Sequence, residues 1–115
     1  MGSDDSMSIE DFKAVIAENN GCVLMKFSAD WCGPCKKIAP YIQEKIANLG
    51  NKGLQYLEID IDESCDLFIY LKKKKMVTKV PTFLLYKGNN QSEFCDFSVI
   101  GTDVGEIDAM FKMIE

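Results

Sequence analysis

Two cysteines separated by two residues are the part of this sequence best suited to chemistry. They form the segment Cys32-Gly33-Pro34-Cys35, which follows an apolar run and precedes a helical pattern. Two intervening residues on a first helical turn bring the two sulfurs close enough to bond. The upstream thiol then faces free backbone N–H groups and the positive end of the helix dipole, which favour its thiolate. We therefore predict that Cys32 is the attacking nucleophile and that Cys35 resolves the mixed disulfide.

The alternative for this pair is one half of a structural zinc site. Such a site needs a second pair at ligand spacing, whereas Cys22, Cys65 and Cys95 are isolated along the chain. Pro34 between the two cysteines also suits a redox turn better than a zinc knuckle. We therefore expect redox chemistry and no bound metal.

Composition excludes several other functions. The 115 residues include no histidine, which excludes hydrolases with a histidine base and metal sites that use imidazole. A formal net charge of −5 argues against general binding to nucleic acid or anionic membranes. No apolar run approaches the ~18 residues of a membrane span. Five cysteines, an odd number, and a polar start unlike a secretory leader favour a reducing compartment. We expect a cytoplasmic monomer.

The hydrophobic pattern predicts the elements that position the cysteines. Short apolar runs predict strands at 22–27, 54–61, 83–86 and 94–99. Helical spacing of apolar residues predicts helices after Ser8, from the cysteine pair onward with Pro34 in the first turn, and after Asp103 with Val104 on the apolar face. The apolar run at 67–71 fits a helix or a strand, and the lysines that follow it favour a helix. Ser8 and Asp11 have the form of a capping box, and Asp62 is a candidate cap for the third helix. The order αβαβαββα predicts an α/β fold with a mixed sheet and helices on both faces.

A longer segment around the motif resembles the active-site region of the thioredoxin family. Residues 29–40 read Ala-Asp-Trp-Cys-Gly-Pro-Cys-Lys-Lys-Ile-Ala-Pro, and the similarity continues in 57–62, in 80–83 and in Gly101. The resemblance spans residues 8–115, which we expect to form a single thioredoxin-like domain. It implies a thioredoxin fold with a mixed central sheet. Residues 1–7 carry no apolar alternation, so we expect a disordered N-terminus or a remnant of cloning there. The family's first edge strand would then be absent, leaving four strands with strand 22–27 central.

The resemblance also implies an activity and a set of site residues. The activity is that of a protein-disulfide reductase that supports cell redox homeostasis and binds no cofactor. Its substrates would be oxidised proteins, and its electrons would come from NADPH through a thioredoxin-reductase type of flavoenzyme. Pro81 would be the cis-proline that faces the disulfide, and Val80 would offer its backbone to an extended substrate. Six further residues would complete the substrate-docking surface: Trp31, Gly33, Pro34, Ile100, Gly101 and Thr102.

One pair of positions departs from the family pattern. The buried aspartate of the strand before the active site is replaced by Lys26, and the usual partner lysine aligns with Glu58. One interpretation is that the exchange only keeps a buried ion pair neutral. The other gives the pair a catalytic role, in which Lys26 favours the Cys35 thiolate and weakens the protein as a reductant. Glu58 would then be the proton acceptor.

Four consecutive lysines at 72–75 are a second unusual feature. They are either the solvated end of a helix, a docking patch for an acidic partner, or a nuclear address. Two other functions also stay open for the chain as a whole. One is a less reducing, isomerase-like oxidoreductase, and the other is a thioredoxin-fold scaffold that holds a partner without redox chemistry.

Overall fold

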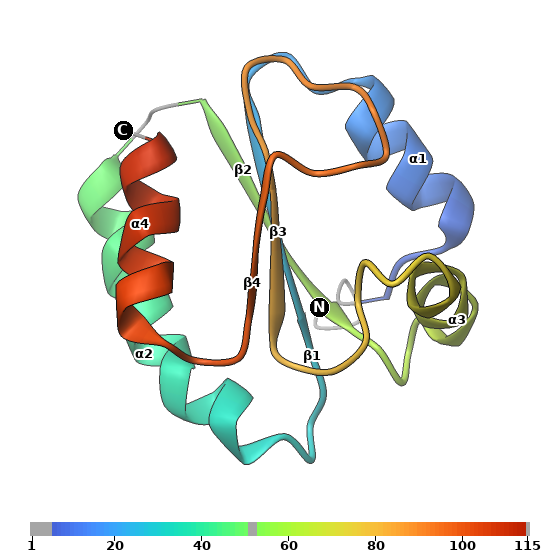
Figure 1. The fold of residues 1–115 in the computed structure, drawn as a ribbon, viewed down its shortest axis with the longest axis horizontal. Helices are drawn as coiled ribbons and strands as arrows, with labels where there is room; N and C mark the ends of the chain where they lie inside the picture. Colours follow the sequence, from blue (N-terminus) through green and yellow to red (C-terminus); the bar gives the residue numbers. More distant parts are fainter. Residues whose placement is uncertain (1–5, 51–52, 115) are drawn as a thin grey trace.

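Helices cover both faces of a four-stranded sheet in this computed structural model, which describes residues 6–50 and 53–114 (Figure 1). The element order in these ranges is αβαβαββα, which confirms the predicted order. The elements are α1 (Ile9–Ala17), β1 (Cys22–Ser28), α2 (Gly33–Leu49), β2 (Leu54–Asp60), α3 (Cys65–Lys73), β3 (Thr82–Tyr86), β4 (Phe97–Ile100) and α4 (Val104–Ile114).

The strands lie in the order β2-β1-β3-β4, so β1 is internal as predicted. Strand β1 is parallel to β2 and antiparallel to β3, and β4 is antiparallel to β3. All five residues of β3 and the middle five of β1 are buried, because helices cover both faces of these two strands. In this register Lys26 lies between Glu58 of β2 and Phe83 of β3.

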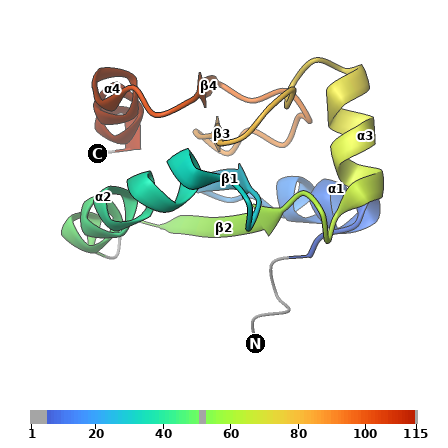
Figure 2. The ribbon, with the colours of Figure 1, turned by 90° about the horizontal axis from the view of Figure 1, so that it is seen from below.

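The sheet divides the interior into two apolar clusters. Figure 2 shows α1 and α3 on one side of the sheet and α2 and α4 on the other. Phe12, Met25, Leu67 and Leu84 belong to the first cluster, and Leu24, Ile42, Phe83 and Phe111 belong to the second. No helix among the described residues is both long enough and apolar enough to cross a bilayer.

Contacts and hydrogen bonds attach the first part of the described chain to the domain. Residues 1–5 of the segment expected to be disordered lie outside the described residues, but Met7 packs against the first cluster. The Met7 backbone N–H also donates to Ser64 Oγ at 2.9 Å. The predicted capping box is present, because Ser8 and Asp11 exchange side-chain hydrogen bonds with each other's backbone N–H groups. Met7, the last residue of that segment, is therefore in contact with the folded domain.

Two predictions about helix ends are wrong. The residue at the N-cap of α3 is Ser64 and not Asp62, whose carboxylate instead accepts a hydrogen bond from Trp31. Val104 begins α4 but is 46% exposed, and the buried face of this helix begins at Ile107. Asp103 does cap this helix, since its Oδ1 accepts from the Glu106 backbone N–H at 3.0 Å.

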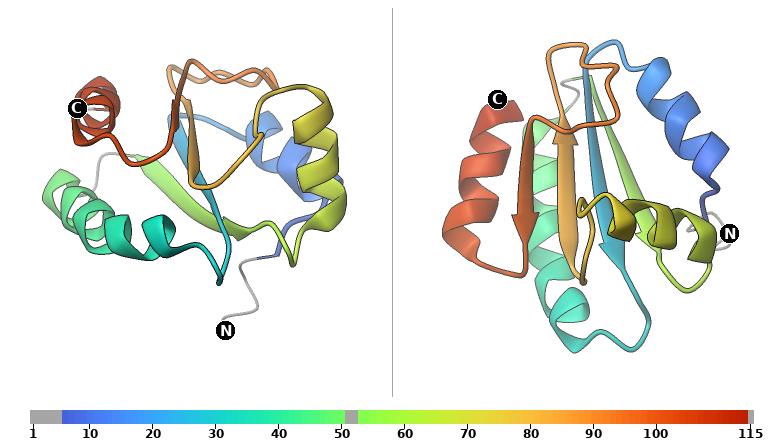
Figure 3. Two further views of the ribbon diagram at one scale, coloured as in Figure 1. Left: turned by 60° about the horizontal axis from the view of Figure 1, so that its bottom comes forward. Right: turned by 45° about the vertical axis from the view of Figure 1, so that its right-hand side comes forward.

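The connection between β3 and β4 is longer than predicted, because β4 begins at Phe97 and the strand expected from residue 94 does not form there. Asn90 and Ser92 supply the reason. Asn90 Oδ1 accepts from the Ser92 N–H, Ser92 Oγ accepts from the Phe94 N–H, and Asn90 Nδ2 donates to the Phe94 carbonyl. These local bonds take backbone groups that a strand ladder would need. The loop thus formed reaches over to the end of α1 (Figures 1 and 3), where Asn19 Nδ2 donates to the Asn90 carbonyl.

Candidate active site

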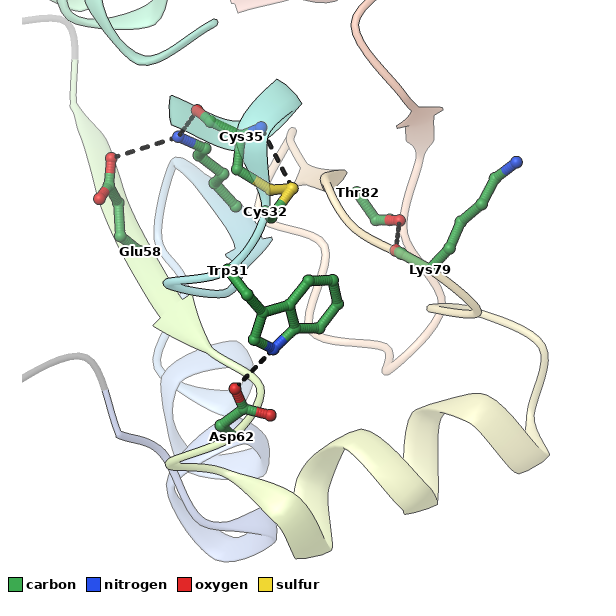
Figure 4. Close-up of a disulfide and its surroundings, with 8 residues drawn as sticks. Trp31, Cys32, Cys35, Glu58, Asp62, Lys79 and Thr82 are labelled. Atoms are coloured by element: carbon green, nitrogen blue, oxygen red, sulfur yellow. Dashed lines mark hydrogen bonds and ion pairs between the residues drawn. A yellow bond between two sulfur atoms is a disulfide. The ribbon is translucent and has the colours of Figure 1, made fainter. Parts of the chain in front are cut away.

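Cys32 and Cys35 form a disulfide at the first turn of α2 (Figure 4). Cys32 is the N-cap of this helix, and its Sγ accepts a hydrogen bond from the Cys35 backbone N–H at 3.1 Å. Pro34 occupies the first turn, where a missing N–H costs no hydrogen bond. Both cysteines are nearly buried, at 4% and 3% exposure. A sulfur in the N-cap position receives the N–H groups that stabilise a thiolate after reduction.

Trp31 covers the approach to the disulfide from the side of α3. Its side chain is 67% exposed, and its indole Nε1 donates to Asp62 Oδ2 at 2.8 Å. Asp62 follows β2, and its own backbone N–H is held by Asp60 Oδ1 at 2.8 Å. A large aromatic side chain is thus held at the protein surface by the hydrogen bond that it donates to Asp62, just after β2.

The segment before β3 lies beside the disulfide. Figure 4 shows Thr82, the first residue of β3, on the side of the Cys32–Cys35 pair, and Lys79 beyond it with its side chain directed away. The Val80–Pro81 peptide bond is cis, and Thr82 Oγ1 donates to the Lys79 carbonyl at 2.5 Å. Val80 packs against the cluster that contains both cysteines.

The end of β4 adjoins the same segment. Ile100 pairs with Thr82, and the Gly101 backbone N–H donates to the Pro81 carbonyl at 2.8 Å. Ile100 is 45% exposed. An open cavity of about 440 Å³ lies between this edge and the start of α2, lined by Gly33, Pro34, Lys37, Ile38 and Thr102. The predicted docking residues thus lie in two groups. One is Trp31 with the start of α2, and the other is the segment before β3 with the end of β4 and the two residues that follow it.

Lys26 and Glu58 lie beneath the active-site turn and face each other, as the charge exchange in the sequence predicts. Lys26 Nζ lies 3.9 Å from Glu58 Oε2 and donates to the Cys35 carbonyl at 3.3 Å (Figure 4). The Lys26 side chain is 3% exposed and that of Glu58 is 35% exposed. The ammonium therefore links the carboxylate directly to the backbone of one active-site cysteine.

Burial determines the electrostatics of this pair. Removal from water lowers the pKa of the Lys26 ammonium, and the Glu58 carboxylate opposes part of that shift. Tyr56 was not predicted as part of the site, but its hydroxyl donates to Glu58 Oε2 at 2.7 Å. Burial, followed by this hydrogen bond, raises the pKa of the Tyr56 hydroxyl, so it remains a donor at neutral pH. The same carboxylate oxygen thus faces both Tyr56 and Lys26.

Sequence reasoning also missed Lys37 as part of the cavity wall. A signal existed for Tyr56, which precedes Glu58 by two residues and so shares its face of the strand. The three remaining cysteines are free thiols, and Cys65 is the exposed one. In residues 6–50 and 53–114, no group of histidine, cysteine or acidic residues is arranged to hold a metal ion.

Comparisons with known proteins agree with this geometry. The sequence model of the thioredoxin family matches residues 5–103. Thioredoxin 1 of Plasmodium falciparum is 30% identical over 104 residues, covering 90% of this chain and 86% of that protein. The thioredoxin of Bacillus subtilis is 38% identical over 96 residues, covering 84% and 78%. The crystal structure of oxidised mitochondrial thioredoxin 3 from Saccharomyces cerevisiae superposes with a TM-score of 0.75 at 26% identity, covering 97% and 96%.

Proteins of this kind exchange a vicinal pair of thiols with disulfides in other proteins, and the Cys32–Cys35 pair is able to form the disulfide that this chemistry requires. This chain belongs to the thioredoxin family, and its active-site pair supports protein-disulfide reductase activity.

Proposed function

We propose that Cys32 attacks substrate disulfides and that Cys35 completes their reduction. The Cys32 thiolate forms a bond to one substrate sulfur and releases the other as a thiolate. Cys35 then loses its proton and attacks Cys32 Sγ, which releases the second substrate thiolate and forms the Cys32–Cys35 disulfide. Two electrons pass from the protein to the substrate. The observation that carries this assignment of roles is the position of Cys32 at the N-cap of α2, with its sulfur facing the helix N–H groups.

Substrates are proposed to bind as extended chains along the segment before β3. Val80 would pair its backbone with the substrate in the manner of an added strand. Pro81 would face the disulfide, and its neighbours at the end of β4 would flank the substrate. Two observations support this proposal: Trp31 and Ile100 are exposed, and Gly33, Pro34 and Thr102 line the open cavity, with Gly101 between Ile100 and Thr102.

Lys26 and Glu58 are proposed to tune the second thiol. A cation bonded to the Cys35 carbonyl favours negative charge on that residue, which stabilises the reduced form. Glu58 is proposed to accept the Cys35 proton through a bridging water. Its partial exposure supports this role, because a water has access to the carboxylate.

The remaining partners are proposed from family membership. Oxidised proteins are the substrates, and the disulfide is reduced again by a thioredoxin-reductase type of flavoenzyme that uses NADPH. The chain is proposed to act as a cytoplasmic monomer that contributes to cell redox homeostasis.

Reduction of insulin, followed by turbidity as its chains separate, tests the proposal. With dithiothreitol as the electron donor, wild-type protein should accelerate the reaction, and Cys32→Ser should abolish the acceleration. Cys35→Ser should accumulate a mixed disulfide with the substrate, visible by mass spectrometry. Cys65→Ser is the matched control and should retain full activity. An equal rate for wild type and Cys32→Ser would instead favour the alternative of a scaffold protein.

Recycling is tested separately. Oxidised protein is mixed with NADPH and a purified thioredoxin reductase, and the loss of NADPH absorbance is recorded. Steady consumption in the presence of insulin is expected. No consumption, together with oxidation by glutathione disulfide at a potential closer to −200 mV than to −270 mV, would favour the isomerase-like alternative.

A further inference from the structure

We propose that the C-terminal end of α3 is a docking surface for an acidic polypeptide segment, distinct from the active site. This lysine surface consists of Lys13, the four lysines at 72–75, and the rings of Tyr70 and Phe94. The proposal goes beyond the reductase activity, because it concerns binding and requires no thiol.

Cations from two helices meet around one ring at this surface. Lys13 Nζ of α1 lies 5.5 Å from the Tyr70 ring centroid, and Lys74 Nζ lies 5.0 Å from the same centroid. Lys74 Nζ is also 5.9 Å from the ring of Phe94, which is 63% exposed. Like charges held near one ring repel each other, and an incoming anion relieves that repulsion.

Carboxylates of the protein leave this charge largely uncompensated. The salt bridges among the described residues are Lys26–Glu58 and Lys45–Asp108, and neither includes a lysine of this surface. Glu93 contacts this surface through its Oε1, which accepts a hydrogen bond from the Tyr70 hydroxyl. The five ammonium groups of this surface thus form no salt bridge with a carboxylate of the described residues.

Helix stability explains only part of the lysine run. Lys72 and Lys73 lie in the last turn of α3, where cations interact favourably with the helix dipole. Lys74 is the C-cap, and Lys75 follows it with a φ of 61°, a left-handed conformation that favours glycine. Two backbone bonds fix this turn, from the Lys75 N–H to the Lys72 carbonyl at 3.0 Å and from the next N–H to the Leu71 carbonyl at 2.9 Å. Lys75 thus places a charged side chain at a left-handed backbone position that glycine would favour.

Charge along α3 selects an acidic peptide over a longer polyanion. The opposite end of the helix carries Asp62, Glu63 and Asp66. Asp66 and Lys74 are separated by about 12 Å along the helix, which exceeds the screening length of about 8 Å at physiological salt. A short carboxylate-rich segment fits the basic end alone. An extended phosphate chain would run onto the acidic end and be repelled.

Binding of a fluorescein-labelled hexaglutamate peptide to the oxidised protein, measured by anisotropy at about 50 and 200 mM NaCl, tests the proposal. Lys73→Gln with Lys75→Gln should weaken binding roughly tenfold at low salt and reduce its salt dependence. The matched control removes two lysine charges outside this surface, Lys87→Gln with Lys112→Gln, and should leave affinity within about twofold. Equal losses in both double variants would overturn the proposal, because net charge alone would then explain the binding.

Two further measurements separate docking from folding and from nucleic acid. Lys75→Gly should lower the affinity while leaving the melting temperature unchanged or raised, since glycine suits the left-handed turn. If the affinity and the melting temperature both fall, Lys75 stabilises the fold, and this result would contradict the docking role. Tighter binding of a ten-residue oligothymidylate than of hexaglutamate at the same salt would also overturn the choice of an acidic polypeptide. Insulin reduction by the Lys73 and Lys75 double variant should be unchanged, so failure of docking and failure of the reductase function are distinguishable.

Discussion

The ion pair beneath the active-site turn should be energetically coupled, and a double-mutant cycle measures the coupling directly. The variants are Lys26→Met, Glu58→Gln and the two together. Methionine keeps the apolar stem of the lysine, and glutamine keeps an oxygen that accepts from the Tyr56 hydroxyl. Glu58→Gln therefore removes a charge and keeps the hydrogen bond from Tyr56. Lys26→Met also removes the bond to the Cys35 carbonyl, but this loss is present in both the single and the double variant and cancels from the coupling energy.

The distance between the two charges and their exposure to water determine the expected coupling energy. Two unit charges 3.9 Å apart attract by about 4 kcal/mol at an effective dielectric constant of about 20. The Glu58 side chain is 35% exposed, so water screens roughly half of that value and leaves about 2 kcal/mol of coupling. Glu58→Gln should cost about 2 kcal/mol, because it leaves a buried ammonium without its carboxylate. In the Lys26→Met background the same change should cost almost nothing.

Urea unfolding of the oxidised protein at pH 7 gives the four free energies of unfolding. A coupling below about 0.5 kcal/mol would refute the reasoning, since the effects of independent sites on stability add to within that value.

A charge reversal gives a second check on the same pair. Lys26→Asp alone should be strongly destabilising, and adding Glu58→Lys should recover most of the lost stability. If the single and double variants melt alike, the two side chains do not interact.

Three more predictions concern redox potential, pH and helix capping. Lys26→Met should make the reduction potential of the disulfide more negative by about 20 mV, because about 1 kcal/mol of charge stabilisation of the reduced form is lost. The potential is measured against a glutathione buffer, and a more positive value would contradict the proposed role of Lys26. The hydrogen bond from Tyr41 lowers the pKa of Asp108 below its ordinary value of 3.8. The Asp108 carboxylate therefore stabilises the fold at neutral pH, and this stabilisation is lost as the pH falls through the lowered pKa. Wild type should therefore exceed Asp108→Asn in urea stability at pH 7, with the difference shrinking below pH 3.8; a constant difference would exclude the linkage. Ser8→Ala should lower the free energy of unfolding by about 1 kcal/mol, whereas no change would mean that the bond from the Asp11 N–H is not stabilising.

Local sequence patterns were sufficient to predict the structure wherever neighbouring residues determine it. The apolar run of β1 predicts a buried strand because helices cover both of its faces, and the spacing of Cys32 and Cys35 predicts a bond across one helical turn. The capping box of Ser8 is likewise read from residues three apart. The position of Lys26 opposite Glu58 came from the family resemblance, since no local pattern reveals which residues two strands place side by side.

Predictions failed where a distant partner or a competing hydrogen bond determines the structure. Asp62 has the right spacing for a helix cap, but the indole of Trp31, 31 residues away in sequence, takes its carboxylate. The expected strand at 94–96 gave way to bonds between Asn90, Ser92 and the backbone of Phe94. The shared contact of Tyr56 and Lys26 with one carboxylate oxygen depends on side-chain directions that alternation alone does not specify.

The outer edge of β2 has a consequence for handling the protein in solution. In the described residues, β2 pairs with β1 along one side and with no strand along the other, and it is seven residues long. An open edge of this length is a template on which a second molecule can add a strand. The carboxylates of Glu58 and Asp60 lie on β2, and the net charge of −5 adds general repulsion between molecules. That repulsion vanishes near the isoelectric point of about 4.7, so self-association through this edge should be greatest in mildly acidic buffers.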